Sequence, residues 1–177
     1  MTSRIAHAHE AASGPTRAAQ GEGGAVVAGG WQAGAAGRSV EFCVYGIPGP
    51  QGSKRHVGGG RMIESSAKVK PWREAVKWAA REAMTATGLA MLDGPLRLTV
   101  VYTLPKPASA PKRRRTYPDK KPDGSKLQRS TEDALTDAGL WRDDARVVEW
   151  IGVKAYPGEH PDALDAPGAR IRVEVIA

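Results

Sequence analysis

KPDGSKLQRSTEDALTDAGLWRDD, residues 121–144, is the stretch around which we expect the rest of the chain to be arranged. Asp123, after a proline, ends the preceding segment, Lys126–Asp137 predicts a helix, and Gly139 ends that helix. Asp143–Asp144 follows directly. A loop, a helix and a turn in this order are expected to return the acidic pair toward Asp123. Carboxylates gathered from separate loops suit Mg²⁺, which prefers oxygen ligands.

Alternating apolar residues and turn residues predict the other elements. They are a strand at 40–47, a glycine-turned hairpin at 56–63, a helix at 68–87, and strands at 95–104, 146–156 and 169–176. This order predicts one α/β domain of the α+β type over residues 39–177, with helices packed on a mixed β-sheet. Residues 1–38 are rich in small and polar residues without periodicity, so we expect a disordered tail there.

The helix at 68–87 carries two stripes at helical spacing. The apolar stripe is predicted to be core and consists of Trp72, Val76, Ala79 and Ala83. A basic stripe on nearly the opposite side consists of Lys70, Arg73, Lys77 and Arg81. Such a stripe is either a solvated helix face or part of a surface for a polyanion. In the helix at 126–137, Leu127, Thr131, Ala134 and Ala138 point inward, while Arg129 and Asp133 are expected to form an exposed ion pair on the other side.

The chain has 177 residues, of which 41% are apolar and 25% charged, so it suits one soluble domain with its own core. Its net charge is +7, and nearly all of the excess positive charge lies in residues 105–121, which contain seven basic residues and one acidic residue, Asp119. Four of them are consecutive, from Lys112 to Arg115. They repel one another, which indicates either an extended loop awaiting a polyanion or a solvated run of charges.

Several classes of protein are disfavoured by composition. The single cysteine, Cys43, excludes an intramolecular disulfide, and the four histidines show no zinc-ligand spacing. The start of the sequence has no secretory leader pattern, and no apolar run is long enough to span a membrane. We therefore expect a cytoplasmic protein that needs no membrane partner.

The chain resembles the RusA family of Holliday-junction resolvases, small dimeric endonucleases of bacteria and their phages. The family signature runs roughly Pro-Asp-x-Asp-Asn-x-x-Lys-x-x-x-Asp-Ala-Leu, followed by a glycine-containing turn and Asp-Asp. Its start, middle and end are matched by Pro122-Asp123, Asp133-Ala134-Leu135 and Gly139 to Asp144. Residues 50–55 and 68–73 also look like phage-encoded members, so the resemblance covers about residues 40–177.

The resemblance implies a homodimer that resolves four-way DNA junctions with Mg²⁺, or Mn²⁺, as cofactor. It makes Asp123 and Asp144 metal-site carboxylates, with Asp143 beside them, and places Arg129 where the family has a functional lysine. A divalent ion activates water for phosphodiester hydrolysis, and Arg129 is expected to steady the developing charge. The basic residues expected to grip DNA phosphates are Lys54, Arg55, Lys70, Arg73, Lys77, Lys112, Arg113, Arg114, Arg115 and Lys126.

One part of the signature departs from the family. Ser125 stands where the family has its second catalytic aspartate, and Lys126 stands where it has asparagine. A hydroxyl supplies no negative charge, so metal affinity is expected to fall unless Asp133, Glu132 or Asp119 compensates. Two interpretations therefore stay open: a metal-dependent junction endonuclease, and a catalytically weakened or inactive relative that binds branched or single-stranded DNA.

Overall fold

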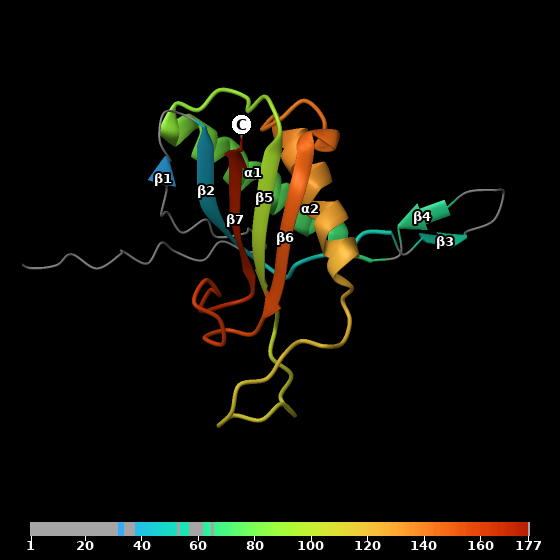
Figure 1. Cartoon of the computed structure of the whole chain (residues 1–177). Coiled ribbons are helices and arrows are strands. Elements are labelled where there is room, and N and C mark those ends of the chain that lie inside the picture. The colour runs from blue at the N-terminus through green and yellow to red at the C-terminus, as the bar shows by residue number, and fades with distance from the viewer. Residues whose placement is uncertain (1–31, 34–37, 53, 57–61, 65, 177) are drawn as a thin grey trace, which may run out of the picture.

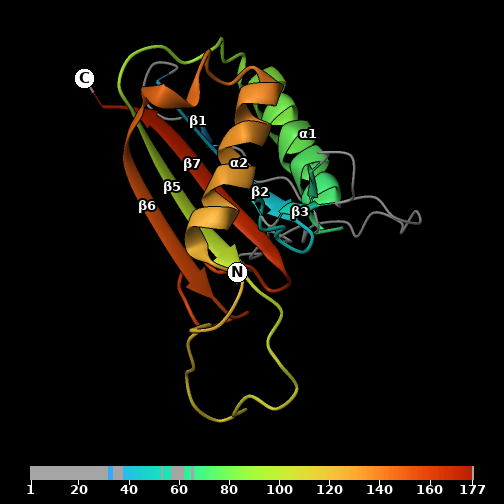
Figure 2. The ribbon, with the colours of Figure 1, turned by 90° about the vertical axis from the view of Figure 1, so that its right-hand side faces the viewer.

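The computed structural model describes residues 32–33, 38–52, 54–56, 62–64 and 66–176. A five-stranded sheet carries helices α1 and α2 on one face, and Figure 1 and Figure 2 show no helix of the described residues on its other face, called the uncovered face below. The elements are β1 (Gln32–Ala33), β2 (Ser39–Tyr45), β3 (Lys54–His56), β4 (Met62–Glu64), α1 (Val69–Thr87), β5 (Leu96–Thr103), α2 (Gly124–Ala138), the 3₁₀ turn η2 (Asp144–Arg146), β6 (Val147–Ala155) and β7 (Gly168–Val175). The predicted α+β fold with a mixed sheet is confirmed.

The strand order is β1-β2-β7-β5-β6, which leaves β6 at one edge of the sheet. Among the strand pairs of the described residues, only β5–β6 is parallel, because the connection between them crosses back through residues 105–121 and α2. Strands β3 and β4 pair separately and confirm the predicted hairpin, whose glycine turn lies outside the described residues. Neither α1 nor α2, the helices of the described part, is long and apolar enough to cross a membrane.

The boundaries of the helices and of the longer strands differ from the predictions by one or two residues, and two differences are informative. Helix α2 begins at Gly124, two residues before the predicted start, because Asp123 has an extended backbone (φ −68°, ψ 136°) and serves as the N-cap residue. Gln32–Ala33, inside the predicted tail, pairs with β2. The rest of the tail up to residue 37 lies outside the described residues.

The core lies between the helices and one face of the sheet. The predicted apolar stripe of α1 is confirmed, since Trp72, Val76, Ala79 and Ala83 are all at most 1% exposed. The inward residues of α2 are buried as well. A buried polar node joins the layers: Thr131 Oγ1 accepts hydrogen bonds from Trp72 Nε1 at 3.3 Å and from Tyr102 OH at 2.9 Å.

The basic stripe of α1 contacts α2 instead of facing only solvent. Arg73 donates to the carboxylates of Asp133 at 3.1 Å and Asp137 at 2.6 Å. Arg81 donates to the Asp137 carbonyl at 3.0 Å, near the end of α2, where a cation complements the helix dipole. The expected Arg129–Asp133 pair is therefore wrong, because the Asp133 carboxylate instead accepts from Arg73 and from Gln51.

The segment after β2 lies between the two helices and fixes their spacing. The Gly49 carbonyl accepts from Ser130 Oγ at 2.6 Å, and the Gln51 amide donates to the Lys126 carbonyl at 2.9 Å. A Cβ atom at Gly49 would lie 2.3 Å from the Lys68 carbonyl oxygen, so only glycine fits there. The Gln51–Lys126 hydrogen bond joins this segment to the first turn of α2, which directly follows Asp123.

Candidate nucleic-acid interface and acidic residues

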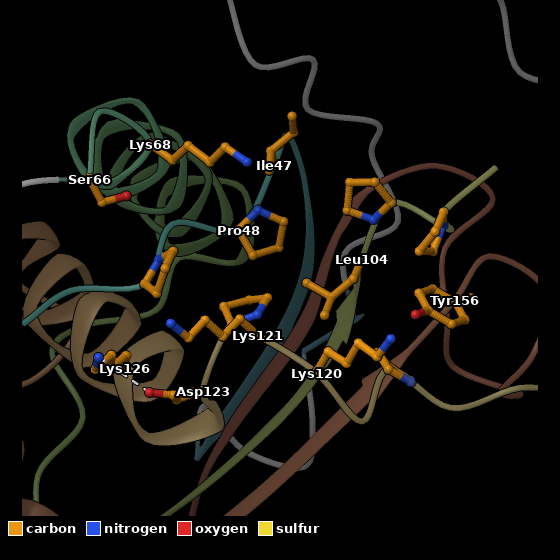
Figure 3. A pocket seen from close by; sticks show the side chains of 15 residues that line it. Ile47, Pro48, Ser66, Lys68, Leu104, Lys120, Lys121, Asp123, Lys126 and Tyr156 are labelled. Atoms are coloured by element: carbon orange, nitrogen blue, oxygen red, sulfur yellow. Dashed lines mark ion pairs between the residues drawn. The ribbon is translucent and has the colours of Figure 1, made fainter. Parts of the chain in front are cut away.

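A cleft of about 630 Å³ opens at the end of β5, where the basic loop leaves the sheet (Figure 3). Four lysines line it: Lys68, Lys120, Lys121 and Lys126. Asp123 is the one acidic residue among the lining residues and pairs with Lys126 at 3.2 Å. Six prolines, which restrict the backbone, make up much of the remaining wall. The cleft is thus a cationic, stiff-walled surface beside the first acidic residue of the signature.

The basic loop, residues 105–121, is tied to the β6–β7 connection by Glu159. This carboxylate accepts from Lys106 Nζ at 2.5 Å and from the Thr116 amide at 2.9 Å. The hydrogen bonds from Lys106 and Thr116 lower the pKa of Glu159, which keeps it ionised. Between these anchors, Lys112–Arg115 is exposed. The consecutive cations therefore project outward from a loop that is held at both ends.

Lys154 fixes the end of the basic loop that leads into Asp123. From β6 its Nζ donates to the Lys120 carbonyl at 3.0 Å and to the Pro122 carbonyl at 3.1 Å. These bonds place the adjacent Asp123 beside the last residues of β6. Neither Lys154 nor Glu159 stands out in the sequence, because each is a single charge in a segment with no functional motif, and only the fold reveals what it contacts.

Asp143 and Asp144 lie after the other end of α2. Asp143 caps η2 through its side chain, which accepts from the Ala145 amide at 2.8 Å, and Asp144 is exposed. Burial raises the pKa of Glu132, on the flank of α2, and the charges of Asp144 and Asp133 raise it further. Glu132 therefore lies within electrostatic range of Asp144.

A single copy of the chain does not bring these carboxylates together. Asp123 precedes α2, which has 15 residues and is therefore about 22 Å long, while Asp143–Asp144 follows its far end. Metal-bound oxygens lie about 2–2.6 Å from the ion, so residues at the two ends cannot share one. No group of three potential metal ligands occurs among the described residues. The three predicted ligands do not fit one ion within one subunit.

The remaining predicted residues fall into separate groups. Ser125 and Arg129 are both exposed and lie four residues apart, on the same side of α2. Lys70 is exposed on α1, while Lys77 pairs with Glu74 at 2.7 Å and Arg73 is held by α2. The backbones of Lys54 and Arg55 form part of β3, and their side chains lie outside the described part.

The uncovered face of the sheet carries charges of both signs. Arg97 bridges Glu149 and Glu174 across three strands, and Arg170 pairs with Glu41. These residues belong to a shallow hollow lined by three arginines and four acids: Arg97, Arg170, Arg172, Glu41, Glu149, Glu174 and Asp162. The charges largely cancel. An exposed run of unneutralised cations is therefore found at the loop end and not on this face.

Comparison with known proteins identifies relatives of this chain. The family model described as "Endodeoxyribonuclease RusA" matches residues 46–174. The crossover junction endodeoxyribonuclease RusA of Escherichia coli K12 is 33% identical over 109 residues, which are 61% of this chain and 78% of that protein. The homologue from Shigella sonnei has the same identity and coverage, and that of Enterobacteria phage 82 is 32% identical over the same length. The chain belongs to the RusA family of endodeoxyribonucleases.

Proposed function

We propose that this protein is a junction-resolving endonuclease that hydrolyses phosphodiester bonds in four-way DNA with the help of a divalent cation. The observation that carries the proposal is the pairing of family membership with Asp123, Asp143 and Asp144 at the acidic positions of the family signature. The relatives are named crossover junction endodeoxyribonucleases, and we extend that substrate to this chain.

The DNA backbone is proposed to contact the loop end of the molecule. Lys112–Arg115 is exposed there, and the lysines of the cleft lie on the same side of the sheet end. Such contacts hold phosphates without reading bases, which suits a substrate defined by its shape. Lys70 and Lys126 remain in the proposed surface. We assign Arg73 a positioning role, because its guanidinium is already held by Asp133 and Asp137.

The cation is proposed to be Mg²⁺ or Mn²⁺, because the candidate ligands are carboxylates. Asp123, Asp143 and Asp144 are the proposed ligands, and because they lie at two ends of α2, one subunit does not place all three around one ion. Ser125 leaves the set one carboxylate short of the family signature. Of the three acids considered as replacements, we favour Glu132, which lies within electrostatic range of Asp144, whereas Asp133 is occupied by Arg73. Arg129, exposed one turn after Ser125, is proposed to face the scissile phosphate.

A second candidate function is recognition of branched DNA without cleavage. The observation favouring it is Ser125, which is exposed in the first turn of α2 and brings no negative charge to the acidic set. In that case the basic surface binds DNA equally well in EDTA. The endonuclease instead needs a divalent ion for its chemistry.

The deciding experiment incubates purified protein with a labelled four-way junction in Mg²⁺, in Mn²⁺ and in EDTA. The Ser125→Asp variant runs alongside, and Asp144→Asn is the inactive control. Symmetric nicks by the wild type, absent in EDTA and in Asp144→Asn, support the endonuclease. Binding without nicks, with cleavage appearing only in Ser125→Asp, supports the second candidate. Full cleavage by Asp144→Asn contradicts the assignment of that carboxylate.

A further inference from the structure

Tyr117 is the only aromatic residue of the basic loop. It is 64% exposed, more than any other large apolar residue in the described part of the chain. Figure 2 shows the loop projecting beyond the ends of β5 and β6. An aromatic ring that is open to water and surrounded by cations suits a ligand with both flat faces and negative charges, which is the chemistry of a nucleic acid strand.

One face of the Tyr117 ring is covered by Arg115. The guanidinium carbon of Arg115 lies 4.8 Å from the ring centroid, which is the geometry of a cation–π contact. A ring that stays 64% exposed beneath this contact has its opposite face open to solvent. The open face is large enough for a flat group to stack on, and the Arg115 cation lies directly behind it.

The backbone around Tyr117 is held in place. The Thr116 amide donates to the Glu159 carboxylate at 2.9 Å, and the Asp119 amide donates to the Tyr117 carbonyl at 2.9 Å. Between these two bonds, Pro118 is buried. The ring is therefore presented by an ordered segment of the loop, so stacking on it costs less conformational entropy than stacking on a ring in a mobile chain.

Tyr117 also lies next to the cleft that Asp123 lines. Pro118, the following residue, belongs to the wall of that cleft, as do Lys120 and Lys121. Figure 3 shows the side chains of these two lysines at the cleft. A nucleotide whose base stacks on Tyr117 therefore has cations nearby for its own phosphates, and its strand lies beside the first acidic residue of the signature.

We propose that Tyr117 stacks on a nucleobase exposed at the branch point of a junction and thereby makes the protein prefer branched DNA to linear duplex. Inside a duplex, neighbouring pairs cover both faces of each base, so a base must be unstacked before it contacts Tyr117. At a branch point the strands diverge and the stack is interrupted, so this cost is smaller. Every base has a flat face, so the contact recognises shape and not sequence.

The inference rests on the proposed function and adds a residue that distinguishes between DNA shapes. The cations of the loop, Lys112–Arg115, are suited to phosphates, which linear and branched DNA both present. They therefore supply affinity without selectivity. The ring of Tyr117 supplies selectivity, because it gains a partner only where a base face is free.

The preference is tested by fluorescence anisotropy with a labelled four-way junction and a linear duplex of the same arm sequence, both in EDTA. Tyr117→Ala is expected to weaken junction binding by about 5-fold or more and to leave duplex binding unchanged. Tyr117→Phe keeps the ring and is expected to match the wild type. Tyr117→Leu keeps an apolar side chain without a flat ring and is expected to behave like Tyr117→Ala.

Trp78→Ala is the matched control, because Trp78 is an aromatic residue of similar exposure, 61%, in the middle of α1. It is expected to leave the preference for the junction unchanged. Equal weakening of junction and duplex binding in Tyr117→Ala overturns the inference, since it means that the loop as a whole has changed. A wild type without a preference for the junction, or a Tyr117→Leu protein that matches the wild type, overturns it as well.

Contact with a base is tested directly by photo-crosslinking. A 5-iodouracil is placed either at the branch point or in the middle of one arm, and the crosslinked residue is identified by mass spectrometry. A crosslink to Tyr117 is expected from the branch point and not from the arm. No crosslink to Tyr117, or equal yields from the two positions, overturns the inference.

Failure of the inference and failure of the proposed function give different results. Both assays are carried out in EDTA, so neither depends on hydrolysis. A wild type that prefers and crosslinks the junction through Tyr117 but does not nick it in Mg²⁺ or Mn²⁺ supports the inference and contradicts the endonuclease. A wild type that nicks the junction while Tyr117→Ala keeps the full preference supports the endonuclease and overturns the inference.

Discussion

Arg73 and Asp133, sixty residues apart in the sequence, form an ion pair of 3.1 Å that joins α1 to α2. The second guanidinium nitrogen of Arg73 reaches Asp137, and Gln51 donates to the same Asp133 oxygen at 2.6 Å. Three segments are thereby held together on the flank of α2. Because α2 separates Asp123 from Asp143–Asp144, the orientation of α2 that this network sets determines where these three aspartates lie.

Breaking the Arg73–Asp133 pair is expected to lower the free energy of unfolding and to leave the contacts with DNA unchanged. Both side chains are a little over one quarter exposed, so the coupling energy in a double-mutant cycle of Arg73→Ala and Asp133→Ala is expected to be about 1 kcal/mol. Urea unfolding of the wild type, both single variants and the double variant measures it. Additive effects contradict a direct pair. The salt dependence of DNA binding is expected to keep its slope in Arg73→Ala.

Replacing Thr131 by valine is expected to destabilise the core by about 2–3 kcal/mol. The hydroxyl accepts from Trp72 and Tyr102, and its removal leaves two buried donors without a partner while the side chain keeps nearly the same volume. Thermal unfolding measures the effect. Tyr102→Phe removes one donor of the same node and is expected to be milder. A Thr131→Val protein as stable as the wild type contradicts the importance of this node.

Gly49 is expected to tolerate no side chain. In Gly49→Ala, the new Cβ meets the backbone of Lys68 and Val69 at 2.9 Å or less, so the two helices must move apart, at an expected cost of about 1–3 kcal/mol. Gly124→Ala is the control, because a Cβ atom at that residue would meet nothing within 4 Å. Denaturant unfolding of both variants measures the difference. Equal stability of the two variants contradicts the close approach.

The local elements follow from the sequence because their signals are local. Helix periodicity predicts α1 and the inward face of α2, and glycines mark both helix ends, Gly88 and Gly139, each with positive φ. What the sequence does not reveal is which charges meet across elements. Asp133 pairs with a residue of α1 and not with Arg129 on its own helix. The packing of α1 on α2 brings the Arg73 guanidinium within 3.1 Å of the Asp133 carboxylate, and the sequence gives no signal of that packing.

The positions of Asp123 and Asp144 in space could likewise not be predicted from the sequence. The spacing of Asp123 and Asp144 matches the family signature, but spacing along a chain does not specify whether a turn folds the chain back. Here α2 continues for 15 residues, and Asp144 lies after it as the first residue of η2, directly before β6.

Glu159→Gln is expected to loosen the basic loop. The charge of Glu159 holds Lys106 and the Thr116 amide, so its neutral replacement weakens both bonds. Hydrogen exchange of the Thr116 amide at neutral pH is expected to speed up in the variant. Exchange of amides in the core of β5 is the internal control and stays slow. Unchanged protection at Thr116 contradicts the anchoring role.

Acid is expected to loosen the same anchor in the wild type. Because the folded protein lowers the pKa of Glu159, its ionised form stabilises the fold above its ordinary pKa of 4.5, and this contribution is lost as pH falls through the lowered value. Acid titration followed by the Glu159 side-chain carboxyl resonance in NMR measures that midpoint. A midpoint at or above 4.5 contradicts the ion pair with Lys106. Glu159→Gln lacks this titration and serves as the control.

Neutralising the exposed cations of the loop is expected to weaken DNA binding for every sequence alike. The variant replaces Lys112, Arg113, Arg114 and Arg115 with glutamine. Removing one phosphate interaction reduces the slope of log affinity against log salt by about 0.9, so the full change is expected to lower it by roughly 2–4. Arg172→Gln, on the uncovered face of the sheet, is the control and is expected to leave the slope unchanged, because that residue pairs with Glu174 away from the basic loop. Fluorescence anisotropy of a labelled junction across a salt series measures both variants. If the loop variant keeps the wild-type slope, the loop does not contact DNA and the bound phosphates must lie against the lysines of the cleft.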